Sequence, residues 1–245
     1  MKLRLFRYSG NKQKLLPLYR AIPDNVKRIV EPYLGSGAFI INGKLPGIGY
    51  ETNGDIVAMW KWLQKSSPAE LHDLNELFIR AKQKCEKPDI KDMKLDLGPQ
   101  TYMRVNAASL VLGQLKSWKI YPQNTLPINE TIACLPRLKD IEIVHGSANS
   151  YKHQDGDILF VDPPYTETDG GYEEKGVVDH TSVYSPSTTN QLISATNNPI
   201  IFTYGTNAST IFSSYSWEIV KTVKVPNMRV GGTVDRIEHV SYINW

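Results

Sequence analysis

The stretch DILFVDPPY, residues 157–165, decides the fold class predicted for this chain. Residues Asp157–Val161 form a short apolar run bounded by turn residues, a pattern typical of a central parallel strand. The two prolines that follow cannot extend a strand ladder, so the chain must leave the sheet at Asp162. The stretch therefore predicts a buried strand that presents Asp162 at its carboxyl end.

A second strand followed by a turn lies upstream, in VEPYLGSGAF, residues 30–39. We expect a strand over Arg28–Glu31, a glycine turn over 35–37 and a helix from Ala38 onward. Open α/β folds bind ligands at the carboxyl ends of their strands, so this turn predicts a ligand site. Glu51 ends the next predicted strand, where its carboxylate can accept hydrogen bonds from both ribose hydroxyls.

The rest of the chain alternates helices and strands. Further helices are predicted over Lys12–Ala21, Asp55–Gln64 and Gln191–Thr196, and further strands over Gly49–Glu51, Pro199–Thr203, Trp217–Val225 and His239–Ile243. The last two strands alternate apolar and polar residues and are predicted to pair as an antiparallel hairpin. This order predicts an α/β fold built on a Rossmann-like sheet.

The composition changes over residues 66–145, which are first polar and helical and then rich in prolines. Such a shift predicts an inserted, mainly helical lobe between two parts of one catalytic domain, 1–65 and 146–245. The length of 245 residues with 41% hydrophobic content suits this organisation.

Charge and composition exclude several classes. The net charge of +3 permits nucleic acid as a partner without requiring it. Cys85 and Cys134 lack C-x-x-C spacing and the histidines lack H-x-x-x-H spacing, so we expect no disulfide framework and no metal site. No signal peptide or membrane span is expected, which predicts a cytoplasmic protein. A Rossmann oxidoreductase is excluded because no G-x-G-x-x-G follows Glu31.

The DPPY corner has the groups to handle an amine. Asp162 and the Pro163 carbonyl can both accept hydrogen bonds from one NH2 group, and Tyr165 offers a flat face for a base to stack on.

Four motifs occur in the order FRYSGNK (6–12), EPYLGSGAF (31–39), YETNGD (50–55) and DPPY (162–165). In type and order they resemble the motifs of DNA adenine methyltransferases of the Dam-like group. The resemblance implies a class I methyltransferase sheet, S-adenosylmethionine as cofactor, and methylation of adenine N6 in double-stranded DNA by base flipping. The segment 66–145 would then be the target-recognition lobe.

The resemblance also implies roles for individual residues. The catalytic corner would be Asp162, Pro163, Pro164 and Tyr165. The cofactor would contact Tyr8, Lys12, Glu31, Pro32, Gly35, Ser36, Gly37, Glu51 and Asp162. Arg229 and Glu238 resemble a pattern near the end of the family's sequences. Two places differ from the family: Ser147 stands where relatives often have an aspartate, and Thr203-Tyr204-Gly205 replaces a Ser-Asn pair.

Basic and aromatic residues alternate in the predicted lobe, a mixture suited to phosphate contacts and groove reading. The candidate DNA-binding residues are Arg104, Lys116, Trp118, Lys119, Tyr121 and Arg137. We expect a monomer, with a transient dimer as the alternative. Other readings stay open: an N4-cytosine DNA methyltransferase, an enzyme acting on an RNA or a protein glutamine amide, or a catalytically inactive DNA-binding relative.

Overall fold

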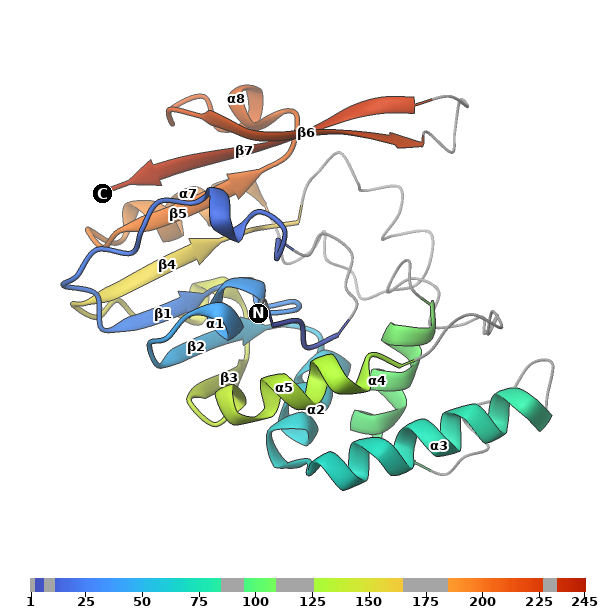
Figure 1. Ribbon diagram of the computed structural model, residues 1–245. Helices are drawn as coiled ribbons and strands as arrows, with labels where there is room; N and C mark the ends of the chain where they lie inside the picture. Colours follow the sequence, from blue (N-terminus) through green and yellow to red (C-terminus); the bar gives the residue numbers. More distant parts are fainter. Residues whose placement is uncertain (1–2, 7–11, 85–94, 109–125, 165–184, 227–232) are drawn as a thin grey trace.

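A seven-stranded sheet runs through the part of the chain that the computed structural model describes, residues 3–6, 12–84, 95–108, 126–164, 185–226 and 233–245 (Figure 1). The strands are β1 (Arg28–Glu31), β2 (Gly47–Glu51), β3 (Ile141–His145), β4 (Asp157–Val161), β5 (Ile200–Tyr204), β6 (Glu218–Pro226) and β7 (Thr233–Ile243). Their order is β3-β2-β1-β4-β5-β7-β6. Strands β1 to β5 pair in parallel, and β7 is antiparallel to both β5 and β6. The predicted α/β class with a Rossmann-like sheet is confirmed.

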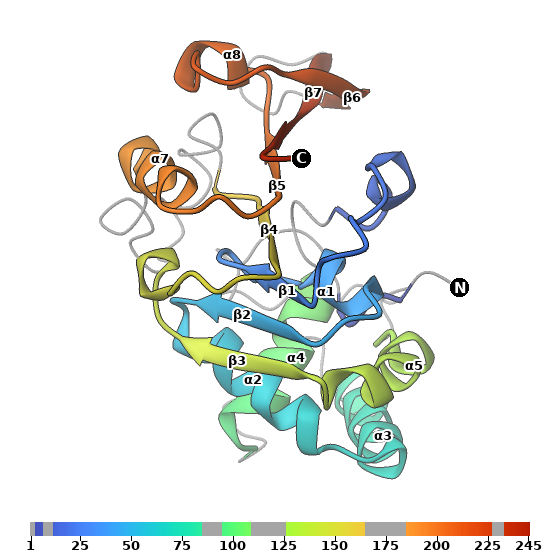
Figure 2. The ribbon, with the colours of Figure 1, turned by 90° about the vertical axis from the view of Figure 1, so that its left-hand side faces the viewer.

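Helices cover both faces of this sheet. They are α1 (Ala38–Asn42), α2 (Gly54–Lys65), α3 (Pro68–Lys84), α4 (Leu97–Ala108), α5 (Ile128–Leu138), α7 (Pro186–Ser194) and α8 (Ala208–Ile211), with 3-10 turns η1 (Leu16–Leu18) and η4 (Ala148–Ser150). Figure 2 shows α7 on one face of the sheet and α1 and α5 on the other. Caps fix where two helices begin: the Asn53 side chain accepts the N–H groups of Asp55 and Ile56 at α2, and Ser185 accepts that of Thr188 at α7.

The sheet separates two hydrophobic clusters. Along β4, Ile158 and Phe160 join the cluster on the α1 and α2 side, whereas Leu159 and Val161 join the one that includes α7 and α8. This alternation follows from the two-residue period of a strand. A continuous apolar run is therefore required in a parallel strand that is buried on both faces.

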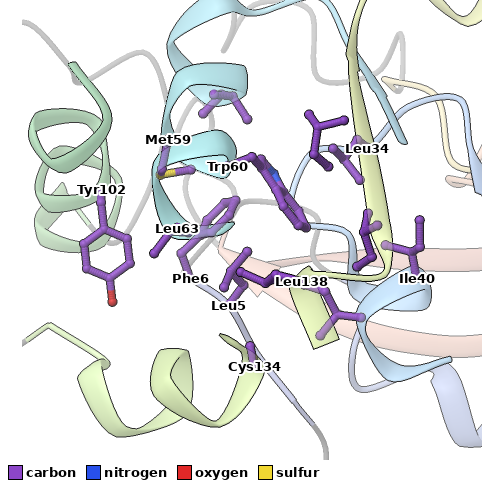
Figure 3. Close-up of a cluster of buried hydrophobic side chains, with 14 of the residues drawn as sticks. Leu5, Phe6, Leu34, Ile40, Met59, Trp60, Leu63, Tyr102, Cys134 and Leu138 are labelled. Carbon is purple, nitrogen blue, oxygen red and sulfur yellow. The ribbon is translucent and has the colours of Figure 1, made fainter. Parts of the chain in front are cut away.

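The helices of the predicted lobe share the first of these clusters. Figure 3 shows members of this cluster from three helices: Trp60 of α2, Tyr102 of α4, and Cys134 and Leu138 of α5. The predicted lobe boundary at residue 145 differs from the structure, because Ile141–His145 is β3, the edge strand of the sheet, and pairs with β2. The reason is that IEIVH alternates buried and exposed residues, as an edge strand does.

The predicted helix over Lys12–Ala21 is wrong. Only the 3-10 turn η1 forms there, with Leu18 N–H bonded to the Leu15 carbonyl at 2.8 Å. Pro17 has no N–H to donate within a helix, which limits the segment to a short turn. Among the described residues, no helix is both long enough and apolar enough to cross a membrane.

Candidate functional site

The carboxyl ends of β1, β2, β4 and β5 lie along one edge of the sheet (Figure 1). β1 lies between β2 and β4 in the sheet. The chain continues from β1 to β2 on one side, whereas it continues from β4 to β5 in the opposite direction, so the strand order reverses between β1 and β4. Open α/β sheets bind their ligands at such a reversal of strand order, outside the carboxyl ends of the strands. The predicted site residues Glu31, Glu51 and Asp162 all stand at this edge.

The glycine turn after β1 requires glycine at two positions. Gly35 and Gly37 have φ values of 46° and 61°, in the left-handed region. A Cβ at position 37 would lie 2.7 Å from the Trp60 ring. The turn is tied down on both sides: Gly37 N–H bonds the Leu34 carbonyl at 2.7 Å, and the Trp60 indole N–H bonds the Gly35 carbonyl at 3.0 Å.

The Glu31 side chain connects β1 to the helix that follows the glycine turn. Its Oε1 accepts the Ile40 N–H at 2.7 Å, which joins the end of β1 to the first turn of α1. Burial raises the pKa of Glu31 to about 8, although hydrogen bonds from the N–H groups of Ile40 and Phe39 oppose the rise. The nearby Asp162 carboxylate adds a small further increase. Glu31 is therefore a buried carboxyl group that holds the backbone of this edge in place.

Glu51 connects β2 to the same turn. One carboxylate oxygen accepts the Asn53 N–H at 2.8 Å, and the other accepts the Gly35 N–H at 3.2 Å. Burial raises the pKa of Glu51, again against the effect of these backbone donors. Because each carboxylate oxygen has two lone pairs, Glu51 keeps the capacity to accept a hydroxyl. Pro32 and Ser36, also predicted to contact the cofactor, are buried within the turn.

Asp162 is held by side chains from two other parts of the chain. The Thr203 hydroxyl, on β5, donates to Asp162 Oδ1 at 2.8 Å. The Lys12 ammonium lies 3.1 Å from the same oxygen and 3.7 Å from Oε2 of Glu238, on β7. Lys12 was expected to contact the cofactor; in the structure its buried ammonium lies between two carboxylates. Pro163 is buried and Pro164 half-buried directly after Asp162.

The two described candidates for DNA contact lie on helices of the segment 66–145. Arg104 of α4 faces Asp55 of α2, with a nitrogen-to-oxygen distance of 3.6 Å. Arg137 of α5 donates to the Ile40 carbonyl at 3.0 Å and to the Leu45 carbonyl. These bonds give Arg137 a structural function, attaching α5 to α1 and the loop after it. The remaining candidates, Lys116, Trp118, Lys119 and Tyr121, lie outside the described residues, as do Tyr8, Tyr165 and Arg229.

The comparisons find similarity to solved structures but not to family models or curated proteins. No family model matches the chain, and no curated protein matches it. The solved structure of P. horikoshii TYW2 in complex with MeSAdo aligns with 98% of this chain and 64% of its own, at 8% identity and a TM-score of 0.36. This chain thus spans less than two thirds of that protein's length, and a similarity this weak adds nothing to an assignment of activity. The strand order by itself shows a Rossmann-like α/β sheet.

Three residues near Asp162 were not predicted as site members. The position of Thr203 beside Asp162 could have been predicted from the strand order, because the carboxyl ends of adjacent parallel strands lie side by side. Glu238 was noted only through a family pattern, and Tyr19 gave no signal because its contacts are distant in sequence. Burial, and then the negative charges of Asp162 and Glu238, raise the pKa of the Tyr19 phenol far above its usual range.

Within the described ranges, no group of three or more histidine, cysteine or acidic residues could hold a metal ion.

Proposed function

We propose that this protein is an S-adenosylmethionine-dependent DNA methyltransferase that methylates the N6 amine of adenine in duplex DNA. One observation carries the proposal. Asp162 and Pro163 directly follow β4, and one of the two strands hydrogen-bonded to β4 is β1, which leads into the glycine turn. A carboxylate and a rigid carbonyl therefore stand at the reversal of strand order, next to a turn that admits a ligand closely.

The residues around that turn fit the cofactor. Gly35 and Gly37 carry no side chain, so the backbone of this turn would accommodate the methionine part of S-adenosylmethionine. Glu51 would accept hydrogen bonds from the ribose hydroxyls through its remaining lone pairs. When bound, the cofactor supplies an activated methyl group on a sulfonium.

Asp162 and the Pro163 carbonyl would perform the chemistry by accepting the two N–H groups of the target amine. This favours a nitrogen whose lone pair is localised rather than spread into the ring. With the amine held in this way, its nitrogen would be oriented to take the methyl group as the carbon–sulfur bond breaks and the bonding pair stays on sulfur. The extra proton on nitrogen leaves to Asp162 or water. Orienting the reactants can supply about 7–11 kcal/mol of the barrier reduction, and acceptors placed where charge develops add to it.

The target amine lies inside the duplex, so the base must be flipped out at a cost of about a few kcal/mol. Tyr165 would recover part of that cost by stacking on the base. The basic and aromatic residues of the segment 66–145 would contact phosphates, with Lys116 and Lys119 as the candidates to test by salt dependence.

The decisive experiment incubates the purified protein with duplex DNA and a methyl-labelled donor, and then identifies the labelled nucleoside. We expect N6-methyladenine. The Asp162→Ala variant should still bind duplex DNA but transfer methyl groups about a hundredfold more slowly, because a preorganised polar group is lost. Asp24→Ala removes an exposed carboxylate and serves as the matched control, with wild-type activity expected.

Other outcomes separate the alternatives. N4-methylcytosine as product would overturn the base assignment and leave the mechanism intact. Full activity of Asp162→Ala would refute the mechanism. Tight duplex binding with no methyl transfer and no calorimetric signal for S-adenosylmethionine would identify an inactive DNA-binding relative.

A further inference from the structure

Building on the proposed function, we propose that Thr203 and Lys12 are positioning residues that orient the Asp162 carboxylate for methyl transfer. Both act on the same atom: the Thr203 hydroxyl lies 2.8 Å and the Lys12 ammonium 3.1 Å from Asp162 Oδ1. They approach from separate parts of the chain, β5 and the segment before η1.

The sheet sets the position of Thr203. Val161 pairs with Phe202 in the parallel register of β4 and β5, so the next residues along the two strands, Asp162 and Thr203, are neighbours at the sheet edge. Thr203 is 1% exposed, and a β-branched side chain has few rotamers. Its hydroxyl therefore donates from a fixed point.

Glu238 sets the position of Lys12. A lysine side chain is long and flexible, so a single partner leaves its ammonium poorly defined. Here the ammonium lies between Asp162 and Glu238, 3.1 Å from one carboxylate and 3.7 Å from the other. Lys12 and Glu238 are both buried, which shields this interaction from solvent and salt.

Two donors on Oδ1 restrict rotation of the whole carboxylate. Because the group is planar, fixing Oδ1 also fixes the direction in which Oδ2 points. Charge-assisted hydrogen bonds are the strong ones in proteins, and small errors in placement reduce rates steeply. Loss of either donor should therefore slow methyl transfer while cofactor binding changes little.

The first test compares Thr203→Val, which keeps the shape and removes the hydroxyl, with Thr203→Ser, which keeps the hydroxyl. Single-turnover methyl transfer to duplex DNA should be about tenfold slower in Thr203→Val, the scale of a lost hydrogen bond to a charged group. Thr203→Ser should stay within about threefold of wild type. Calorimetry should find S-adenosylmethionine affinity within about threefold of wild type in both variants.

The second test asks whether Thr203 acts through Asp162. In the Asp162→Ala background, adding Thr203→Val should cause no further loss of rate, because the group to be oriented is gone. Lys12→Met should likewise slow methyl transfer, and it should cause no further loss of rate in the Asp162→Ala background. Thermal melting reports whether each variant is folded. Lys14→Met, two residues away and exposed, is the matched control and should behave as wild type.

The proposal is overturned if Thr203→Val transfers methyl groups at the wild-type rate, if Thr203→Ser loses as much as Thr203→Val, or if Thr203→Val slows the Asp162→Ala variant by the same factor. An equal loss of cofactor affinity and rate would assign Thr203 to binding and also overturn it. A wild-type protein with no methyl transfer at all would instead refute the proposed function.

Discussion

Replacement of Glu31 by glutamine should remove a large pH dependence of stability. Glutamine has nearly the same shape, and its side-chain oxygen can still accept the Ile40 N–H that Glu31 accepts at 2.7 Å. It cannot ionise, however. The substitution thus separates the charge of the side chain from its packing and its hydrogen bond.

The magnitude follows from burial. The pKa of Glu31 is raised from 4.5 to about 8 in the folded protein, chiefly because the buried carboxylate loses its hydration. Each unit corresponds to about 1.36 kcal/mol, so the effect amounts to a few kcal/mol and at most about 5. The folded state holds the proton of Glu31 more tightly than the unfolded state does. The stabilisation of the folded state that depends on this proton is therefore fully present below about pH 4.5. It is lost as the pH rises through about 8.

The assay is urea unfolding of wild type and Glu31→Gln at intervals from pH 5 to pH 9. The variant should gain stability relative to wild type progressively up to about pH 8, and the difference should then level off. Glu142→Gln, at an exposed position on β3, is the control and should give a constant difference. Parallel curves for wild type and Glu31→Gln would refute the argument that burial governs this carboxyl group.

Three further predictions concern the turn, the sheet and the cofactor. Gly37→Ala should destabilise the fold by about 1–2 kcal/mol or more, from the left-handed backbone and the contact with Trp60; an unchanged melting temperature would contradict this. Arg28→Met deprives the buried Asp157 carboxylate of two N–H donors at 2.7 and 2.8 Å, so urea unfolding should show a loss of about 3 kcal/mol, and a loss below about 1 would argue otherwise. Glu51→Ala should weaken S-adenosylmethionine binding by about 1.5–3 kcal/mol in calorimetry; unchanged affinity in a folded variant would move the ribose site elsewhere.

Local patterns in the sequence were sufficient for the central strands. The bounds predicted for β1 and β4 agree with the structure, because a short apolar run closed by turn residues or prolines has few alternatives to a buried strand. The meeting of Glu51 and Asp162 at one edge with the glycine turn also followed from the sequence, since the carboxyl ends of parallel strands share an edge.

Other features depended on contacts between distant residues. The helix expected over Lys12–Ala21 does not form, because Pro17 limits it to a turn and the Lys12 side chain is drawn to Asp162 and Glu238. Nothing in the local sequence indicates that Lys12 will lie beside one carboxylate that follows β4 and another on β7. The contacts of Arg137 were likewise not predictable: its charge suggested DNA contact, which stays a prediction, whereas nothing local indicated its hydrogen bonds to the Ile40 and Leu45 carbonyls.

The placement of β7 between β5 and β6 has a consequence for how the protein becomes active. Lys12 and Glu238 are separated by most of the sequence, and they must come together for the Lys12 ammonium to lie between Glu238 and Asp162. Contacts between such distant residues form slowly, since a long chain segment must close to make them. Until the β6–β7 hairpin docks against β5, the Lys12 ammonium lacks Glu238. The proposed methyl transfer would then appear late in refolding, after the sheet's parallel strands have paired, and its onset would report completion of the fold.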